Sequence, residues 1–338
     1  MEDADFVVNA SWSNNPEDKT VDGVDFTSDQ TFDNIQSAVD EATNDDTTGD
    51  TILVLPPIDS GGSYGQVIIA DDGSSDHNVE DLTLASLAGL TETTIEYDSG
   101  DNAQPTVSIG MLDGSGTVKG FTIERTGDSS NVDEAVGVAG SNVTLKYNIL
   151  KGNPDATSSD NDIDNDIGLL ISEDPHYTDD VVTSVVDTTN VVVSDVNVSG
   201  FQNGIGVAKE GSNSKDVSAT ISDVTVKNSD FGISPLRLSS GGDLTVDVDG
   251  ANLTSNDVNL QTYSSYSLES GDVFTIDNSV FHTPNGAHIE DGADFLDLEE
   301  IREDNTFEGL VYYGNSVYSR VRGRTSRLAV GVNPVKFK

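Results

Sequence analysis

An internal repeat constrains the fold of this chain more than any other feature. The segment Asp195-Val-Asn-Val-Ser-Gly-Phe-Gln-Asn-Gly-Ile205 returns as Asp223-Val-Thr-Val-Lys-Asn-Ser-Asp-Phe-Gly-Ile233, a shift of 28 positions. Further copies run from Gly250 to Leu260 and from Asn278 to Ile289. A repeat of this period is typical of solenoids, in which each unit buries its apolar residues only by stacking on its neighbours.

Each copy is predicted to form two short strands, a corner between them and a looser polar loop. The apolar runs are only a few residues long, which suits strands and not helices. Gly and Asn at the corner suit the left-handed backbone of a tight bend. The predicted fold is therefore all-β, a right-handed parallel β-helix. Its stacked coils should turn seven residues inward: Val196, Val198, Val224, Val226, Leu253, Phe281 and Ile289.

The two ends of the chain differ from the repetitive body. Residues 1–30 show little periodicity and are predicted to be an N-terminal arm. Thr31–Ala42 places Phe32, Ile35 and Val39 at helical spacing, which predicts a short amphipathic capping helix, the only helix that the pattern indicates. The β-helix is predicted to span residues 31–300, and residues 301–338 to form a C-terminal β extension.

The order of these segments resembles a known group of proteins. The helix is followed by Gly49-Asp-Thr-Ile-Leu-Val-Leu-Pro56 and then by Val67-Ile-Ile69, as at the start of pectate-lyase-like and NosD-type β-helix proteins. The resemblance covers about residues 31–290 and implies the fold. It implies no activity, because this fold serves lyases, hydrolases, binding modules and phage tailspikes. The catalytic motifs of pectate lyases and pectinesterases are not evident, so no catalytic residue is assigned.

The charge predicts a habitat. The chain has 60 acidic and 16 basic residues, a formal net charge of −44. Such a chain repels itself in dilute buffer, whereas molar salt shortens the screening length to about 3 Å. A disordered acidic chain is excluded because 35% of the residues are hydrophobic and recur in ordered runs. We expect a haloarchaeal or haloarchaeal-virus protein that requires high salt and does not bind nucleic acid.

The expected location is outside the cell. The chain has no Cys, so it has no disulfide framework. Residues 1–20 show no secretion signal, and no apolar run approaches the length that a membrane span requires. These features favour a virion surface, with a cell surface as the alternative, and we expect a homo-oligomer, a trimer or larger.

The C-terminal segment concentrates positive charge. No acidic residue follows Glu308. The alternation Ser319-Arg-Val-Arg-Gly-Arg324 indicates a strand with one basic face. The segment is predicted either to dock on an acidic virion or surface protein or to cap its own coils. Its basic residues are Arg320, Arg322, Arg324, Arg327, Lys336 and Lys338.

Three groups of residues are weaker candidates for a site. A glycan-binding patch would use Arg237, Tyr263 and Tyr266, although Arg237 also suits an ordinary ion pair. Four carboxylates at alternate positions in one loop suit calcium, or simply an acidic loop: Asp160, Asp162, Asp164 and Asp166. The neighbouring His282 and His288 would suit a transition metal, but the repeat places them on opposite sides of a corner.

Three functions remain open at this point. The first is a non-enzymatic structural or adhesive protein of a halophilic virion or cell surface that contacts host glycans. The second is a secreted polysaccharide lyase or glycoside hydrolase. The third is a haloarchaeal surface matrix protein. Paired carboxylates do not decide between them, because pairs arise by chance in so acidic a chain.

Overall fold

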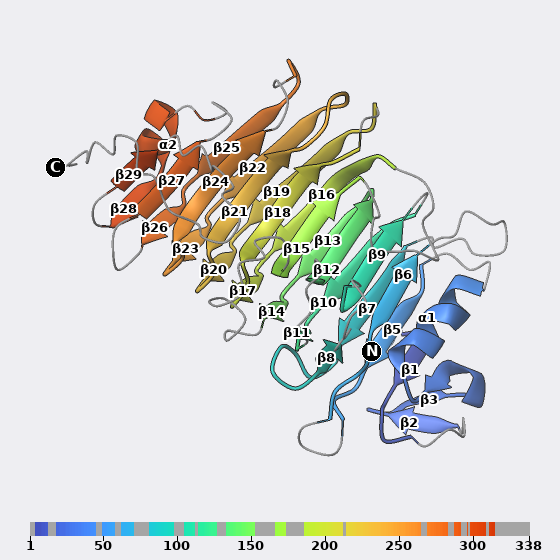
Figure 1. Cartoon of the computed structure of the whole chain (residues 1–338). Coiled ribbons are helices and arrows are strands. Elements are labelled where there is room, and N and C mark those ends of the chain that lie inside the picture. The colour runs from blue at the N-terminus through green and yellow to red at the C-terminus, as the bar shows by residue number, and fades with distance from the viewer. Residues whose placement is uncertain are drawn as a thin grey trace.

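The computed structural model describes residues 4–12, 18–44, 49–57, 62–70, 81–97, 105–111, 114–126, 133–152, 166–173, 186–211, 214–264, 269–282, 287–291, 296, 298–308 and 311–314. Their strands wind into an elongated solenoid of about eight turns (Figure 1). Each complete coil gives one strand to each of three parallel sheets.

The first sheet contains, in spatial order, β25 (Val273–Asp277), β22 (Leu244–Asp249), β19 (Val217–Ser222), β16 (Thr188–Ser194), β13 (Val143–Lys146), β10 (Gly116–Lys119), β7 (Leu82–Ser86), β5 (Thr51–Val54), β1 (Phe6–Val8) and β4 (Thr31–Phe32). The second contains β28 (Thr306–Glu308), β26 (Val280–His282), β23 (Asn252–Thr254), β20 (Thr225–Lys227), β17 (Asn197–Ser199), β14 (Ile149–Lys151), β11 (Thr122–Arg125) and β8 (Thr94–Tyr97). The third contains β29 (Val311–Gly314), β27 (Ala287–Asp291), β24 (Val258–Ser264), β21 (Phe231–Arg237), β18 (Asn203–Lys209), β15 (Asp166–Ser172), β12 (Asp133–Gly140), β9 (Val107–Met111) and β6 (Val67–Ala70). The antiparallel pair β2 (Lys19–Val21) and β3 (Val24–Phe26), the 3-10 helix η1 (Ser28–Gln30) and the helices α1 (Ile35–Asn44) and α2 (Leu298–Asp304) complete the described elements.

This architecture confirms the predicted parallel β-helix and corrects its repeat. The prediction of two strands per unit is wrong, because each coil has three. The repeated motif covers only the second and third strands of a coil. The first strand precedes it, as β16 and β19 show, and alternates small apolar residues with varied polar ones. Its outer positions face solvent and tolerate many residues, so the copies diverge there.

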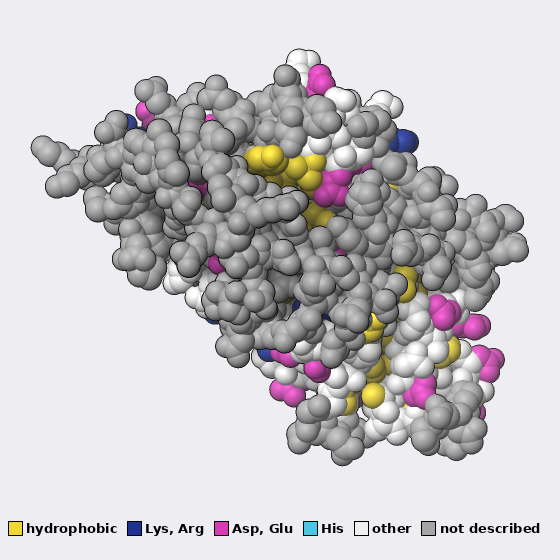
Figure 2. Space-filling view, viewed as in Figure 1, with side chains coloured by type: hydrophobic (Ala, Val, Ile, Leu, Met, Phe, Trp, Pro, Cys, Tyr) yellow, Lys and Arg dark blue, Asp and Glu magenta, His cyan; other side chains and the backbone are white. Residues whose placement is uncertain are grey.

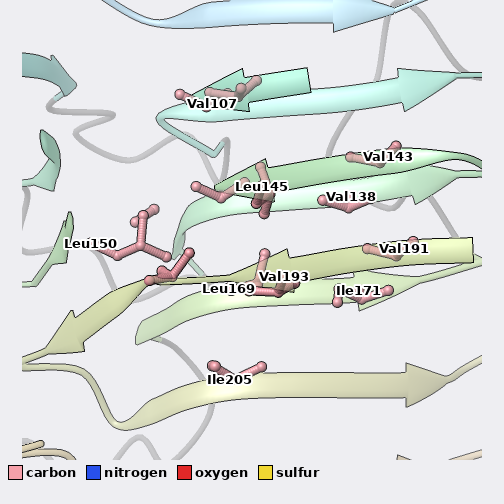
Figure 3. Close-up of a cluster of buried hydrophobic side chains, with 14 of the residues drawn as sticks. Val107, Val138, Val143, Leu145, Leu150, Leu169, Ile171, Val191, Val193 and Ile205 are labelled. Carbon is pink, nitrogen blue, oxygen red and sulfur yellow. The ribbon is translucent and has the colours of Figure 1, made fainter. Parts of the chain in front are cut away.

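The core is a set of columns that run along the solenoid. In the second sheet Leu150, Val198, Val226, Leu253 and Phe281 lie in direct register on successive coils. All seven residues that were expected to face inward are buried. Figure 3 shows the same stacking elsewhere, with Val138 of β12 next to Ile171 of β15. The column ends in a stacked pair of aromatic rings, Phe281 and Phe307, whose centroids are 4.8 Å apart.

The corners between the first and second sheets use a left-handed backbone, as predicted. One residue per coil has a φ between 50° and 86°: Gly120, Tyr147, Asp195, Asp223, Gly250 and Asn278. Asparagines tie two of these corners to the preceding coil. Asn148 donates to the carbonyl of Val118 at 2.8 Å and accepts the N–H of Phe121 at 3.0 Å. Asn305 repeats this pattern at the C-terminal end.

The glycines at the start of the third sheet have a different cause. Gly204 and Gly232 recur in the repeat, but neither has a positive φ. A Cβ on Gly204 would lie 2.7 Å from the carbonyl oxygen of Gly232, and a Cβ on Gly232 would lie 2.4 Å from that of Asn259. These positions are glycine because consecutive coils approach too closely for a side chain.

Both predicted domain boundaries move outward. β1 lies in the first sheet and pairs with β5 and β4, so residues 1–30 are not wholly an arm. Phe6 and Val8 are buried. The coil also continues past residue 300, because β28 and β29 pair with β26 and β27. Both segments are too short to show a periodicity, which is why the sequence did not reveal them.

Helices lie at the two ends of the stack (Figure 1). α1 begins at Ile35, later than predicted, because Phe32 belongs to β4. It packs Ile35 and Val39 on the core, and Gln36 bonds the backbone of Ile68, which satisfies the edge of β6. α2 corrects the expectation of a single helix, and it contacts β25 at the C-terminal end. Neither helix is long and apolar enough to cross a membrane.

Candidate functional site

Arg237 lies at the end of β21 and points into the solenoid rather than to its surface. Its side chain is fully buried. It donates to Asp272 Oδ1 at 2.6 Å and to the carbonyl of Gly242 at 3.0 Å. Arg237 therefore presents no surface of its own to a glycan, and its contacts are those of a buried ion pair.

A second buried ion pair lies on the preceding coil, toward the N-terminal end of the solenoid. Lys209 precedes Arg237 by one repeat and is in register with it. Its Nζ lies 2.5 Å from Glu173 Oε1, and both side chains are fully buried. Glu173 also accepts the N–H groups of Glu210 and Gly211. This pair was not predicted, although two basic residues 28 positions apart in so acidic a chain were a usable signal.

Most of the other predicted residues lie outside the described part of the chain. Tyr263 is 46% exposed on β24, and Tyr266 lies outside the described residues. Asp160, Asp162 and Asp164 also lie outside them, and Asp166 opens β15. The basic C-terminal residues from Arg320 to Lys338 lie outside them as well.

The described residues contain no metal cluster. No group of three or more His, Asp or Glu residues is arranged to hold an ion among them. His282 lies in the second sheet, where its Nδ1 is 2.8 Å from Glu308 Oε2 on the next coil. His288 belongs to β27 in the third sheet. The two histidines are therefore on different sheets, as the repeat predicted.

The outer side of the first sheet is open and polar. Its strands alternate buried and accessible residues along their length. One outward column runs in register over eight coils and consists mostly of short hydroxyl side chains. Its members are Thr51, Thr83, Thr117, Thr144, Val192, Thr220, Asp247 and Thr275, and we call this column the threonine column.

A parallel column on the same face changes in charge along its length. It runs from the apolar Leu53 and Ala85 through Lys119 and Lys146 and then through serines, and it ends with Asp249 and Asp277. Burial raises the pKa of Asp277, and the nearby carboxylates of Asp304, Asp247 and Asp249 raise it further. The C-terminal end of the face thus accumulates negative charge, whereas the two lysines lie nearer its middle.

The third sheet differs, since part of its outer side is buried. Leu170 and Ala208 point away from the main core and are nevertheless buried, in a second cluster with Ile167. Figure 2 shows acidic side chains spread over the visible face, with few Lys or Arg among the described residues. The open face of the first sheet is therefore a long, regular polar surface on the described coils, and its hydroxyl groups can form hydrogen bonds.

Comparison with known proteins supports no family assignment. No protein-family model matches the chain, and no curated protein matches it. Among solved structures, YbhC of Escherichia coli matches with 14% identity and a TM-score of 0.46, over 92% of this chain and 71% of that one. ORF18 of Geobacillus virus E2 matches with 12% identity and a TM-score of 0.36, over 91% and 61%. The A-module of the Azotobacter vinelandii mannuronan C-5 epimerase AlgE4 matches with 14% identity and a TM-score of 0.32, over 85% and 92%. No activity is transferred from these matches, and the chain is described by its own topology as a parallel β-helix.

Proposed function

We propose that this protein is a non-enzymatic structural and adhesive β-helix that holds glycans along the open face of its first sheet. The observation that carries the proposal is the threonine column. Strands of neighbouring coils repeat at about 4.8 Å. The column therefore offers a row of hydroxyl groups, interrupted at Val192 and Asp247, that can both donate and accept hydrogen bonds. A row of this kind suits a long polar chain lying along the solenoid.

Two cations of the coil body, Lys209 and Arg237, are not available as the base of a lyase. A β-elimination lyase requires a base that reaches the sugar, and Arg or Lys commonly serves. Lys209 and Arg237 are each held by a buried carboxylate and have no exposed surface. Both charges form buried ion pairs at the ends of β18 and β21.

Glycan binding is tested by blocking the face. In the doubly substituted Thr117→Glu/Thr144→Glu variant, carboxylates replace hydroxyls at the centre of the threonine column, so affinity for a bound polysaccharide should fall by about tenfold or more. Affinity electrophoresis against a polysaccharide panel in molar KCl measures this. The matched control, Asn197→Glu/Asn252→Glu, adds the same charge to the outer side of the second sheet and should bind as the unsubstituted protein does. Equal losses in both variants, or release of sugar fragments from any bound polysaccharide, would overturn the proposal.

High salt is the second part of the proposal. At a net charge of −44, self-repulsion opposes the folded state once it is no longer screened. Lowering KCl from molar to millimolar concentration should therefore remove most of the β-sheet signal in circular dichroism. Restoring the salt should restore the signal. A spectrum that does not change across this range would contradict the assignment to a halophile.

The proposed setting is the surface of a halophilic virion or cell. The basic residues from Arg320 to Lys338 would contact an acidic partner there, because a halophilic surface is itself acidic. The protein would be a homo-oligomer. Neither calcium nor another cofactor is required by this role.

A further inference from the structure

Tyr147 occupies a backbone conformation that its side chain disfavours. It is the corner residue between β13 and β14, with a φ of 53°. The equivalent corners hold Gly, Asp or Asn, which adopt this conformation more readily. The ring gains little from burial, because the residue is 48% exposed. A bulky aromatic residue kept at a strained and exposed corner points to a function at the surface.

Two lysines lie beside it in an arrangement that is also unfavourable. Lys119 and Lys146 are in direct register on neighbouring strands of the first sheet, where like charges repel. Neither lysine takes part in an ion pair within the described part of the chain, although the chain has 60 acidic residues. The Lys146 ammonium lies 4.7 Å from the centre of the Tyr147 ring.

We propose that Tyr147, Lys146 and Lys119 form a subsite for an anionic sugar, one that carries a carboxylate or a sulfate. The sugar ring would lie on the part of the Tyr147 ring that Lys146 leaves exposed. The two ammonium groups would bind the anionic substituent. Thr117 and Thr144 lie two positions before the lysines on the same face, so their hydroxyls are beside the subsite. This inference rests on the proposed glycan binding and names the ligand class.

The combination of groups suits concentrated salt. Attraction between charges is screened within about 3 Å at molar ionic strength, so ammonium groups act there only in direct contact. Stacking on an aromatic ring does not depend on long-range charge. An aromatic ring beside two cations therefore binds an anionic sugar under conditions in which a basic patch alone would not.

The test uses one polymer in three forms: dextran, carboxymethyl dextran and dextran sulfate. In molar KCl the full-length protein should bind the two charged forms about tenfold more tightly than dextran. The variants Tyr147→Asn and Lys119→Gln/Lys146→Gln should each lose most of that preference. Lys227→Gln, which removes an exposed lysine from the second sheet, should keep it.

Stability separates a binding role from a structural one. Asparagine fits the corner conformation better than tyrosine, so Tyr147→Asn should unfold at the same or a higher temperature than the unsubstituted protein while it loses binding. Equal affinity for all three dextrans would overturn the inference. It would also be overturned if polyglutamate bound as tightly as the charged dextrans and if Tyr147→Asn did not weaken that binding. If binding is lost in Thr117→Glu/Thr144→Glu but not in the tyrosine and lysine variants, this inference fails and the proposed function stands. If the charged dextrans bind through Tyr147 while the threonine column has no effect, the subsite stands without it.

Discussion

Replacing Val226 by aspartate should destabilise the protein by at least about 3 kcal/mol, because it places a carboxylate in the middle of a continuous apolar column. Val226 is fully buried and stacks between Val198 and Leu253. Urea unfolding in molar KCl measures the free energy of unfolding. Burial raises the pKa of the introduced carboxyl, so the loss of stability should be smaller at pH 4 than at pH 8.

The neighbouring Thr225 supplies the matched control. It lies on the same strand but on the outer side, so Thr225→Asp adds the same charge without burying it. Its effect should be within about 0.5 kcal/mol. If Val226→Asp proves as stable as Thr225→Asp, the stacked core is refuted.

Glu173→Gln should lower the free energy of unfolding by about 3–5 kcal/mol, although it only replaces one carboxylate oxygen by an amide NH2 group of similar size. The substitution leaves the buried Lys209 without the carboxylate that now lies 2.5 Å from it. It also weakens the acceptors for the N–H groups of Glu210 and Gly211. The loss should persist in molar salt, because a buried pair is screened much less than an exposed one.

Two further variants identify the cause. Glu173→Gln/Lys209→Met removes both charges and should recover most of the lost stability, since the penalty comes from the uncompensated lysine. Glu124→Gln breaks the exposed pair with Lys151, also 2.5 Å long, and should cost less than about 1 kcal/mol. If the double variant is no more stable than Glu173→Gln, the pair does not act through its charge.

The sequence predicted the fold where the repeat is strict. In the motif from Asp195 to Ile205 and its copy 28 positions later, interior packing limits the choice of residue at nearly every second position. The repeat was not recognisable in strands whose solvent-facing positions tolerate many residues. The first strands β16 and β19 fell outside the repeated motif for that reason. β1 was missed because it has only three residues and pairs with β5 across α1.

The candidate site was less predictable, because the strand register determines which of its residues become neighbours and which side chains face inward. Lys119 and Lys146 are 27 positions apart in the sequence and become neighbours only through the pairing of β10 with β13. Arg237 was identified as unusual, but whether it pointed inward or outward depends on one position of strand register. Tyr147 lies outside the strict copies of the repeat, and its left-handed backbone is visible only in the structure.

The asparagines at the corners bear on the order in which the molecule forms. Asn148 bonds the corner that ends at Phe121, and Asn256 bonds Val226 and Ser229, so each reaches the coil that the ribosome makes first. Strand partners are also near in sequence: Val226 pairs with Val198 before it and Leu253 after it, 28 and 27 positions away. No described strand pairs with a strand from the far end of the chain. A new coil can therefore add to a finished one during translation, and growth from the N-terminal end keeps the exposed edge to a single coil at any moment.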